Sequence, residues 1–208
     1  ALLGDEIARV EAPAGQSLRR ALRTVRTFAG NVTAEPNDLY RRHAFSRYRT
    51  AGQLCGERCE AFALTSWLPR LMRCRRPSDP AHGTGVVSLL VGQPSTGVVG
   101  IVPAARVLAA DAFHRARRGD SADTFDLIES LDWLAEGGAQ IINMSLSGPA
   151  NPALEKAIDA TLTRGIAIVA AVGRPEGRST GYPARYDGVL AVSAVDMLLR
   201  PSRLSMRG

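Results

Sequence analysis

Residues 140–173 read QIINMSLSGPANPALEKAIDATLTRGIAIVAAVG and decide the fold class of this chain. The apolar run Gln140–Leu146 predicts a strand, Pro152–Arg164 has the length and spacing of a helix that Gly165 ends, and Ile166–Val172 predicts a second strand. Both strands are apolar on both faces, which is typical of a parallel sheet covered by helices on its two sides. The stretch therefore predicts an α/β fold with right-handed crossovers.

The same alternation of strands and helices continues in both directions from this stretch. Strands are predicted at Arg106–Ala112 and Val189–Val195, and helices at Gly85–Val91 and Thr124–Glu136. Together these elements predict a three-layer α/β/α domain with a mostly parallel sheet over residues 82–208.

Ligand sites of open α/β sheets lie at the carboxyl ends of the strands. Here those ends carry Ser145–Gly148 and the segment Val172, Gly173 and Arg174. No G-x-G-x-x-G sequence and no Walker loop is present, so a nucleotide site has no motif to support it. The two strand ends are therefore the candidate site.

The first 81 residues differ in character from the rest. Residues 1–41 predict a small α+β piece, and residues 42–81 predict an irregular linker, rich in Arg and Pro, with at most one short helix. The predicted elements of the first piece are a strand at Glu6–Val10, a helix capped by Ser17 with Leu18, Leu22, Val25 and Phe28 on one face and Gly30 at its end, and a strand at Asn31–Glu35.

The net charge of +6 raises the question of nucleic-acid binding. Of the 26 basic residues only Lys156 is a lysine, the arginines are dispersed, and no aromatic residues are interleaved with them for base stacking. We therefore expect no nucleic-acid partner. No run of eighteen apolar residues occurs, so we also expect no membrane span.

The three cysteines, Cys55, Cys59 and Cys74, form no CxxC pair and have no second ligand cluster, so we expect no metal site. Cys55 and Cys59 flank Gly56 closely enough for a small disulfide loop, which fits an oxidising compartment. Three ordinary thiols are an equally good interpretation.

His82 opens the helical stretch in the sequence His-Gly-Thr-Gly. The helix dipole disfavours the cationic form of an imidazole at a helix start, which suits a base that must accept a proton. Gly83 and Gly85 remove side chains around it, so that a backbone or a substrate can approach closely. A solvent-facing cap is the alternative for a histidine in this position.

Five blocks of sequence carry a resemblance to a known family. They are HGTGVVSLLVG (82–92), GIVPAARVLAADAF (100–113), IINMSLSGP (141–149), GIAIVAAVG (165–173) and GYPARYDGVLAVSAVD (181–196). In this order and spacing they resemble the subtilisin-like serine peptidases, the subtilase family. Residues 37–41, NDLYR, are similar to the tail of a subtilase prosegment, so residues 1–41 are interpreted as prosegment-like and 82–208 as a partial peptidase domain.

The resemblance implies a Ser-His-Asp hydrolase that acts on a peptide or protein in extended conformation. By this resemblance His82 is the general base. Ser145, Leu146, Ser147 and Gly148 belong to the strand that pairs with the substrate backbone, and Ala171, Val172 and Gly173 form the opposite wall of the specificity pocket. It also implies a secreted or periplasmic protein without a cofactor. Calcium is a ligand known in the family, and no motif of this sequence shows a site for it.

The sequence departs from the family pattern at three places. The Gly-Thr-Ser-Met-Ala motif of the nucleophile is absent. No apolar strand ending in Asp-Thr/Ser-Gly precedes His82, and Asp79 is better interpreted as a capping or loop carboxylate. Arg174 stands where the family has the Asn whose side chain stabilises the oxyanion.

Two interpretations follow from these departures. In the first, the chain is a truncated serine endopeptidase whose missing segments lie outside these 208 residues. In the second, it is a pseudo-peptidase that serves as a peptide-binding scaffold. Either interpretation predicts that this chain alone has no measurable peptidase activity and is marginally stable.

Overall fold

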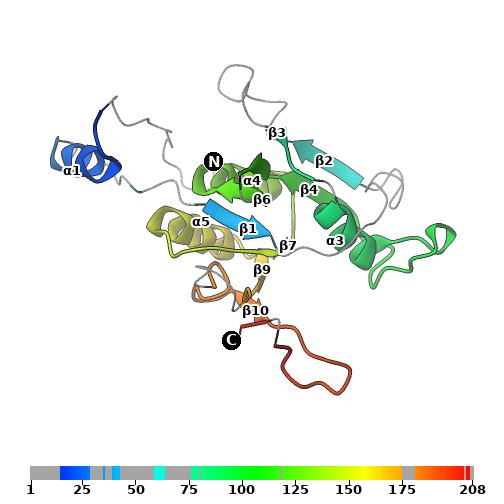
Figure 1. Ribbon diagram of the computed structural model, residues 1–208. Coiled ribbons are helices and arrows are strands. Elements are labelled where there is room, and N and C mark those ends of the chain that lie inside the picture. Colours follow the sequence, from blue (N-terminus) through cyan, green and yellow to red (C-terminus); the bar gives the residue numbers. More distant parts are fainter. Residues whose placement is uncertain are drawn as a thin grey trace.

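The computed structural model describes residues 15–28, 35, 39–42, 59–63, 76–79, 81–117, 119–174, 181–203 and 205–206. Figure 1 traces the chain between its two ends. The predicted amphipathic helix near the N-terminus is present as α1 (Leu18–Phe28). The other predictions for the first 41 residues, at 6–10, Gly30 and 31–34, lie outside the described residues, as do Cys55 and Cys74.

The residues that decide the fold class form most of a three-stranded parallel sheet. Its strands are β7 (Ile141–Met144), β9 (Ala167–Ala171) and β10 (Leu190–Val192), in the order β10-β9-β7. Helix α5 (Pro152–Thr163) connects β7 to β9, and α4 (Thr124–Glu136) precedes β7. The predicted strand-helix-strand order and the α/β fold are therefore confirmed.

A second parallel pair joins β2 (Cys59–Ala63) to β4 (Val107–Asp111). The prediction that residues 42–81 are an irregular linker is wrong at β2, and also at the short strand β3 (Arg76–Pro77). The sequence of β2 is CEAFA, in which Glu60 interrupts a very short apolar run. Such a segment becomes a strand through its partner β4 and not through a pattern of its own.

An antiparallel sheet that the sequence did not predict has the strand order β3-β5-β6-β1-β8. Its further strands are β5 (His114–Ala116), β6 (Gly119–Asp123), β1 (Leu39–Arg42) and β8 (Leu146–Ser147). The single strand predicted over 140–146 is divided at Ser145 into β7 and β8, so the chain passes there from the parallel to the antiparallel sheet. In Figure 1, β1 lies among elements from much later in the chain.

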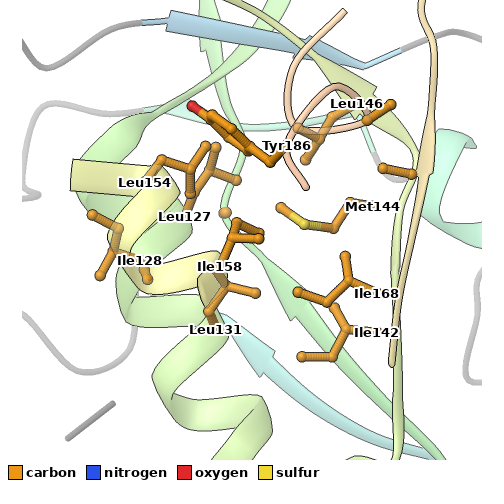
Figure 2. Packing of buried hydrophobic residues seen from close by; sticks show 14 of the residues in the cluster. Leu127, Ile128, Leu131, Ile142, Met144, Leu146, Leu154, Ile158, Ile168 and Tyr186 are labelled. Atoms are coloured by element: carbon orange, nitrogen blue, oxygen red, sulfur yellow. The ribbon is translucent and has the colours of Figure 1, made fainter. Parts of the chain in front are cut away.

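The hydrophobic core lies between the parallel sheet and helices α4 and α5, as Figure 2 shows. The strands contribute Ile142, Met144 and Ile168, and the helices contribute Leu127, Ile128, Leu131, Leu154 and Ile158. Burial alternates along β7 and β9, which points one set of side chains toward the helices.

The other face of this sheet exposes apolar side chains within the described chain. Ile141 is 67% exposed and Leu190 61% exposed. Helices α4 and α5 cover the face of the sheet that holds the core, as predicted. On the opposite face these two side chains lie at the surface among the described residues.

Helix α3 (Ala81–Val91) packs on β4 through Val87 and Val91 and is followed by the 3-10 helix η3 (Pro94–Thr96). The chain then returns so closely that Gly100 N donates to Gly92 O at 2.8 Å. A Cβ on Gly100 would lie 2.5 Å from Gly92 N and from Leu90 O, so this return requires glycine.

Candidate functional site

His82 is the second residue of α3 and is half-buried, so the predicted position at a helix start is confirmed. Asp79 Oδ1 accepts a hydrogen bond from Ala81 N at 2.9 Å, which confirms the interpretation of Asp79 as a capping carboxylate. Within the described chain, no atom lies within 4 Å of the point where a Cβ would stand on Gly83 or Gly85. The two glycines thus leave room for a methyl-sized group at the start of α3.

Two contacts attach the segment before His82 to neighbouring strands. Asp120 Oδ2, on β6, accepts from Asp79 N at 2.7 Å, and the Asp120 side chain is only 3% exposed. Ser78 Oγ lies 3.2 and 3.3 Å from the carboxylate oxygens of Asp111, at the end of β4. The start of α3 is thus held both to the antiparallel sheet and to the parallel pair β2-β4.

The strand end Ser145–Gly148 is largely buried. Asn143 Nδ2 donates to Ser145 Oγ at 2.9 Å, which fixes that hydroxyl where the chain leaves β7. Gly148 N donates to Tyr182 O at 2.8 Å, and Tyr182 N donates back to Gly148 O at 3.2 Å. The backbone of Gly148 is therefore held to that of Tyr182 by a reciprocal pair of hydrogen bonds.

Residues Ala171, Val172 and Gly173 lie at the carboxyl end of β9. Val172 N donates to Val192 O at 3.0 Å, and Gly173 O accepts from Met206 N at 3.0 Å. Strand β8 contacts β9, so the two predicted parts of the substrate site are brought together. Arg174 follows with an exposed side chain.

The strand position between β6 and β8, hereafter the groove, is filled by the chain itself. Strand β1 lies between β6 and β8 and pairs antiparallel with both: Arg41 is in register with Ser121 on one side and Ser147 on the other. Arg42 is in register with Leu146 and Leu39 with Asp123. An extended segment thus pairs with the strand that the family resemblance implies for the substrate backbone.

Strand β6 is the wall of this groove that the sequence did not reveal. Its residues, GDSAD, contain no apolar run or alternation, so nothing in them predicted a strand. Tyr182, which holds Gly148, was likewise not singled out, although it lies in one of the family blocks.

Helix α4, which follows β6 directly, carries closely spaced carboxylates. Burial raises the pKa of Glu129, and the negative charges of Asp123 and Asp132 raise it further. Asp123 is itself buried and caps the helix by accepting from Asp126 N at 3.1 Å. Glu129 therefore binds a proton more tightly in the folded chain than in the unfolded chain.

Replacing Glu129 by Gln is expected to stabilise the chain at pH values above the raised pKa of Glu129. At those pH values the wild-type carboxylate is charged, and folding disfavours the charged form. The gain should shrink as the pH falls from the raised pKa toward the ordinary value of 4.5, where the wild-type carboxyl is protonated in the fold. Since the group is partly exposed, we expect a rise in Tm of about 1–2 °C at pH 8. Thermal melts of both chains at pH 5 and pH 8 measure it, and an equal difference at both values would contradict the assignment.

No helix among the described residues is long and apolar enough to cross a membrane. Over the same residues, no group of three or more His, Cys, Asp and Glu side chains is placed to hold a metal ion.

Comparison with known proteins identifies the family. The model described as "Subtilase family" matches residues 67–207. Subtilisin DY from Bacillus licheniformis is 37% identical over 122 residues, which cover 55% of this chain and 43% of that protein. Subtilisin BL from Lederbergia lenta is 34% identical over 128 residues, covering 58% and 46%.

Solved structures agree with this result. The prenylagaramide maturation protease PagA has a TM-score of 0.60 and 28% identity, covering 76% of this chain and 54% of its own. The self-cleaved protease domain of PatA has a TM-score of 0.59 and 30% identity, covering 76% and 58%. The chain spans about half the length of these relatives. The family model and the solved structures agree that this chain belongs to the subtilase family.

Proposed function

We propose that this chain is the peptide-binding part of a subtilisin-like serine endopeptidase, with His82 as the general base. The observation that carries the proposal is the antiparallel pairing of an extended segment, β1, with β8 at Leu146 and Ser147. Main-chain hydrogen bonds of this kind hold a peptide with little dependence on its side chains. Relatives that are proteases support the assignment of a peptide or protein substrate.

Each part of the site has a role in this proposal. Strands β6 and β8 hold the substrate backbone on its two sides, and Ala171–Gly173 forms the wall of the pocket for one substrate side chain. Residues 1–41 act as a prosegment-like region whose tail, β1, occupies the groove. The enzyme is secreted or periplasmic and needs no cofactor for its peptidase chemistry.

His82 can accept a proton only from a nucleophile that is held beside it. The sequence carries no Gly-Thr-Ser-Met-Ala motif, and Arg174 replaces the amide donor of the oxyanion site. A long, charged and exposed side chain is a poor oxyanion donor because a misplaced donor stabilises little. The same observation favours the second candidate function, a pseudo-peptidase that binds peptides without cleaving them.

We expect this chain to bind an extended peptide without cleaving it. A synthetic peptide with the sequence of residues 37–42 is titrated into the isotope-labelled chain, and the amide resonances of Ser121, Ser147 and Gly148 are followed by NMR. Those resonances should shift, whereas a peptide with alternate N-methylated amides should leave them in place, because it lacks the donors that pair with a strand. Mass spectrometry of the mixture should show intact peptide.

Two results would contradict this expectation. Equal shifts with the N-methylated peptide would show that binding does not use backbone pairing. Hydrolysis that disappears in His82→Ala, or labelling by a fluorophosphonate probe, would show that the chain is an active peptidase by itself. A chain that binds without hydrolysis, and gains no activity from an added segment bearing the missing motif, is a scaffold.

A further inference from the structure

We propose that Asp120 is a positioning residue that couples the groove strand β6 to the helix start that carries His82. The inference rests on the proposed roles of the groove and of His82. Asp120 lies outside the five family blocks and outside the site predicted from the sequence. Its buried carboxylate fixes the position of His82 relative to a bound peptide.

The first link of the coupling is the contact between Asp120 and Asp79. Asp120 lies on β6 next to Ser121, which is in register with Arg41 of the strand in the groove. Its carboxylate is 3% exposed and accepts from Asp79 N at 2.7 Å, a short distance typical of a charge-assisted hydrogen bond. Arg115 Nε, on the neighbouring strand β5, lies 3.9 Å from its other oxygen. A buried carboxylate with these partners has little freedom to move independently of β6.

The second link runs from Asp79 to the helix. The backbone of Asp79 is held by Asp120, and its own carboxylate caps α3 by accepting from Ala81 N. Ala81 and His82 are the first two residues of α3. Two carboxylates in series thus connect the strand that pairs with a peptide to the turn that carries the base.

This connection matters because a catalytic base must be placed within a fraction of an ångström. Displacement of a catalytic group by about 1 Å costs on the order of a hundredfold in rate. A peptide that enters the groove adjusts β6 through backbone pairing, and the link through Asp120 carries this adjustment to the imidazole.

The contact between Ser78 and Asp111 provides the matched control. It attaches the same segment to the chain, but to the end of β4 and not to the groove. Loss of this contact removes an anchor of the helix start without breaking the path from β6. Ser78→Ala should therefore loosen the segment before α3 in general, but it should not remove the coupling between β6 and His82.

The test reads the imidazole resonances of His82 by NMR in the full chain. Groove occupancy is changed by Arg41→Pro, which removes an N–H from the central strand β1. We expect this change to shift the His82 resonances in the wild-type background and in Ser78→Ala. In Asp120→Ala the shift should fall to about a tenth, and in Asp120→Asn it should be largely kept, because the amide oxygen can still accept from Asp79 N.

An equal shift in Asp120→Ala and in wild type would overturn the proposal, as would the absence of any shift in the wild-type background. Should Asp120→Ala not fold, exchange of the Asp79 amide in Asp120→Ser decides, because the serine hydroxyl is one bond too short to reach Asp79 N: about tenfold faster exchange than in wild type supports the contact, and unchanged exchange refutes it. Failure of the proposed function is seen separately, as failure of the peptide with the sequence of residues 37–42 to bind. The His82 resonances do not depend on that result.

Discussion

Arg41→Pro should raise the affinity of this chain for a peptide with the sequence of residues 37–42 by about 10- to 100-fold. A tethered strand competes with free peptide at an effective concentration on the order of millimolar. If the free segment binds with a Kd of about 10–100 μM, the tether leaves roughly 1–10% of the groove open, and the apparent affinity is reduced by that fraction. Proline at a position paired on both sides removes the competitor, since it cannot donate to the ladder.

Fluorescence anisotropy of a labelled peptide measures this change, and Arg41→Ala is the control. The alanine variant loses the same charge and keeps the backbone N–H, so it should bind the peptide almost as weakly as wild type does. Equal gains in the two variants would show that the charge of Arg41, and not strand pairing, closes the groove. Unchanged affinity in Arg41→Pro would show that β1 does not compete with peptide.

The elements predicted from the sequence are those whose pattern lies within one segment. Helix α4 begins and ends where the apolar spacing of Phe125, Ile128 and Leu131 predicts it, and α5 begins at Pro152 as predicted. These patterns are local because one helix face must meet one core. His82 at the start of α3 and the capping role of Asp79 followed from the same local rules.

The elements that the sequence did not predict depend on partners far away in the chain. Strands β1, β2 and β6 are short, and β1 and β6 are also largely polar. Each becomes a strand because it pairs with a neighbouring strand. The pairing of Arg41 with Ser147 joins residues more than a hundred positions apart, which no local periodicity can indicate. Resemblance to subtilases named β8 as a peptide strand, but it could not show that the chain's own residues lie on it.

The acidic residues show the same limit at the level of the site. Asp120 has no motif around it, and its importance appears only when β6 places its carboxylate against Asp79 N. Arg174 was seen from the sequence alone, because it directly follows a block that matches, at the position where the family has Asn. Sequence comparison thus finds departures from a pattern, whereas contacts between segments outside the pattern require the fold.

Ile158→Ala should cost about 2–5 kcal/mol of the free energy of unfolding, the largest loss of stability that we predict. Ile158 has no exposed surface and lies on α5 in the core, in Figure 2 between Leu154 and Leu131 on the helix side and Ile168 on the sheet side. Truncation leaves a cavity that the packed helices cannot close fully. Because the total stability of a domain is typically about 5–15 kcal/mol, a chain that exposes apolar surface on one sheet face has little to spare.

Urea unfolding followed by circular dichroism measures the loss, with Ile141→Ala as the matched control. Ile141 is the same residue type on the neighbouring strand β7, but it is 67% exposed and belongs to the face that points away from the helices. Its truncation removes few contacts and should change the free energy of unfolding by less than about 1 kcal/mol. Similar losses in the two variants would mean that the outer face of the sheet is as well covered as the core, and that the exposed apolar side chains are buried against another surface in solution.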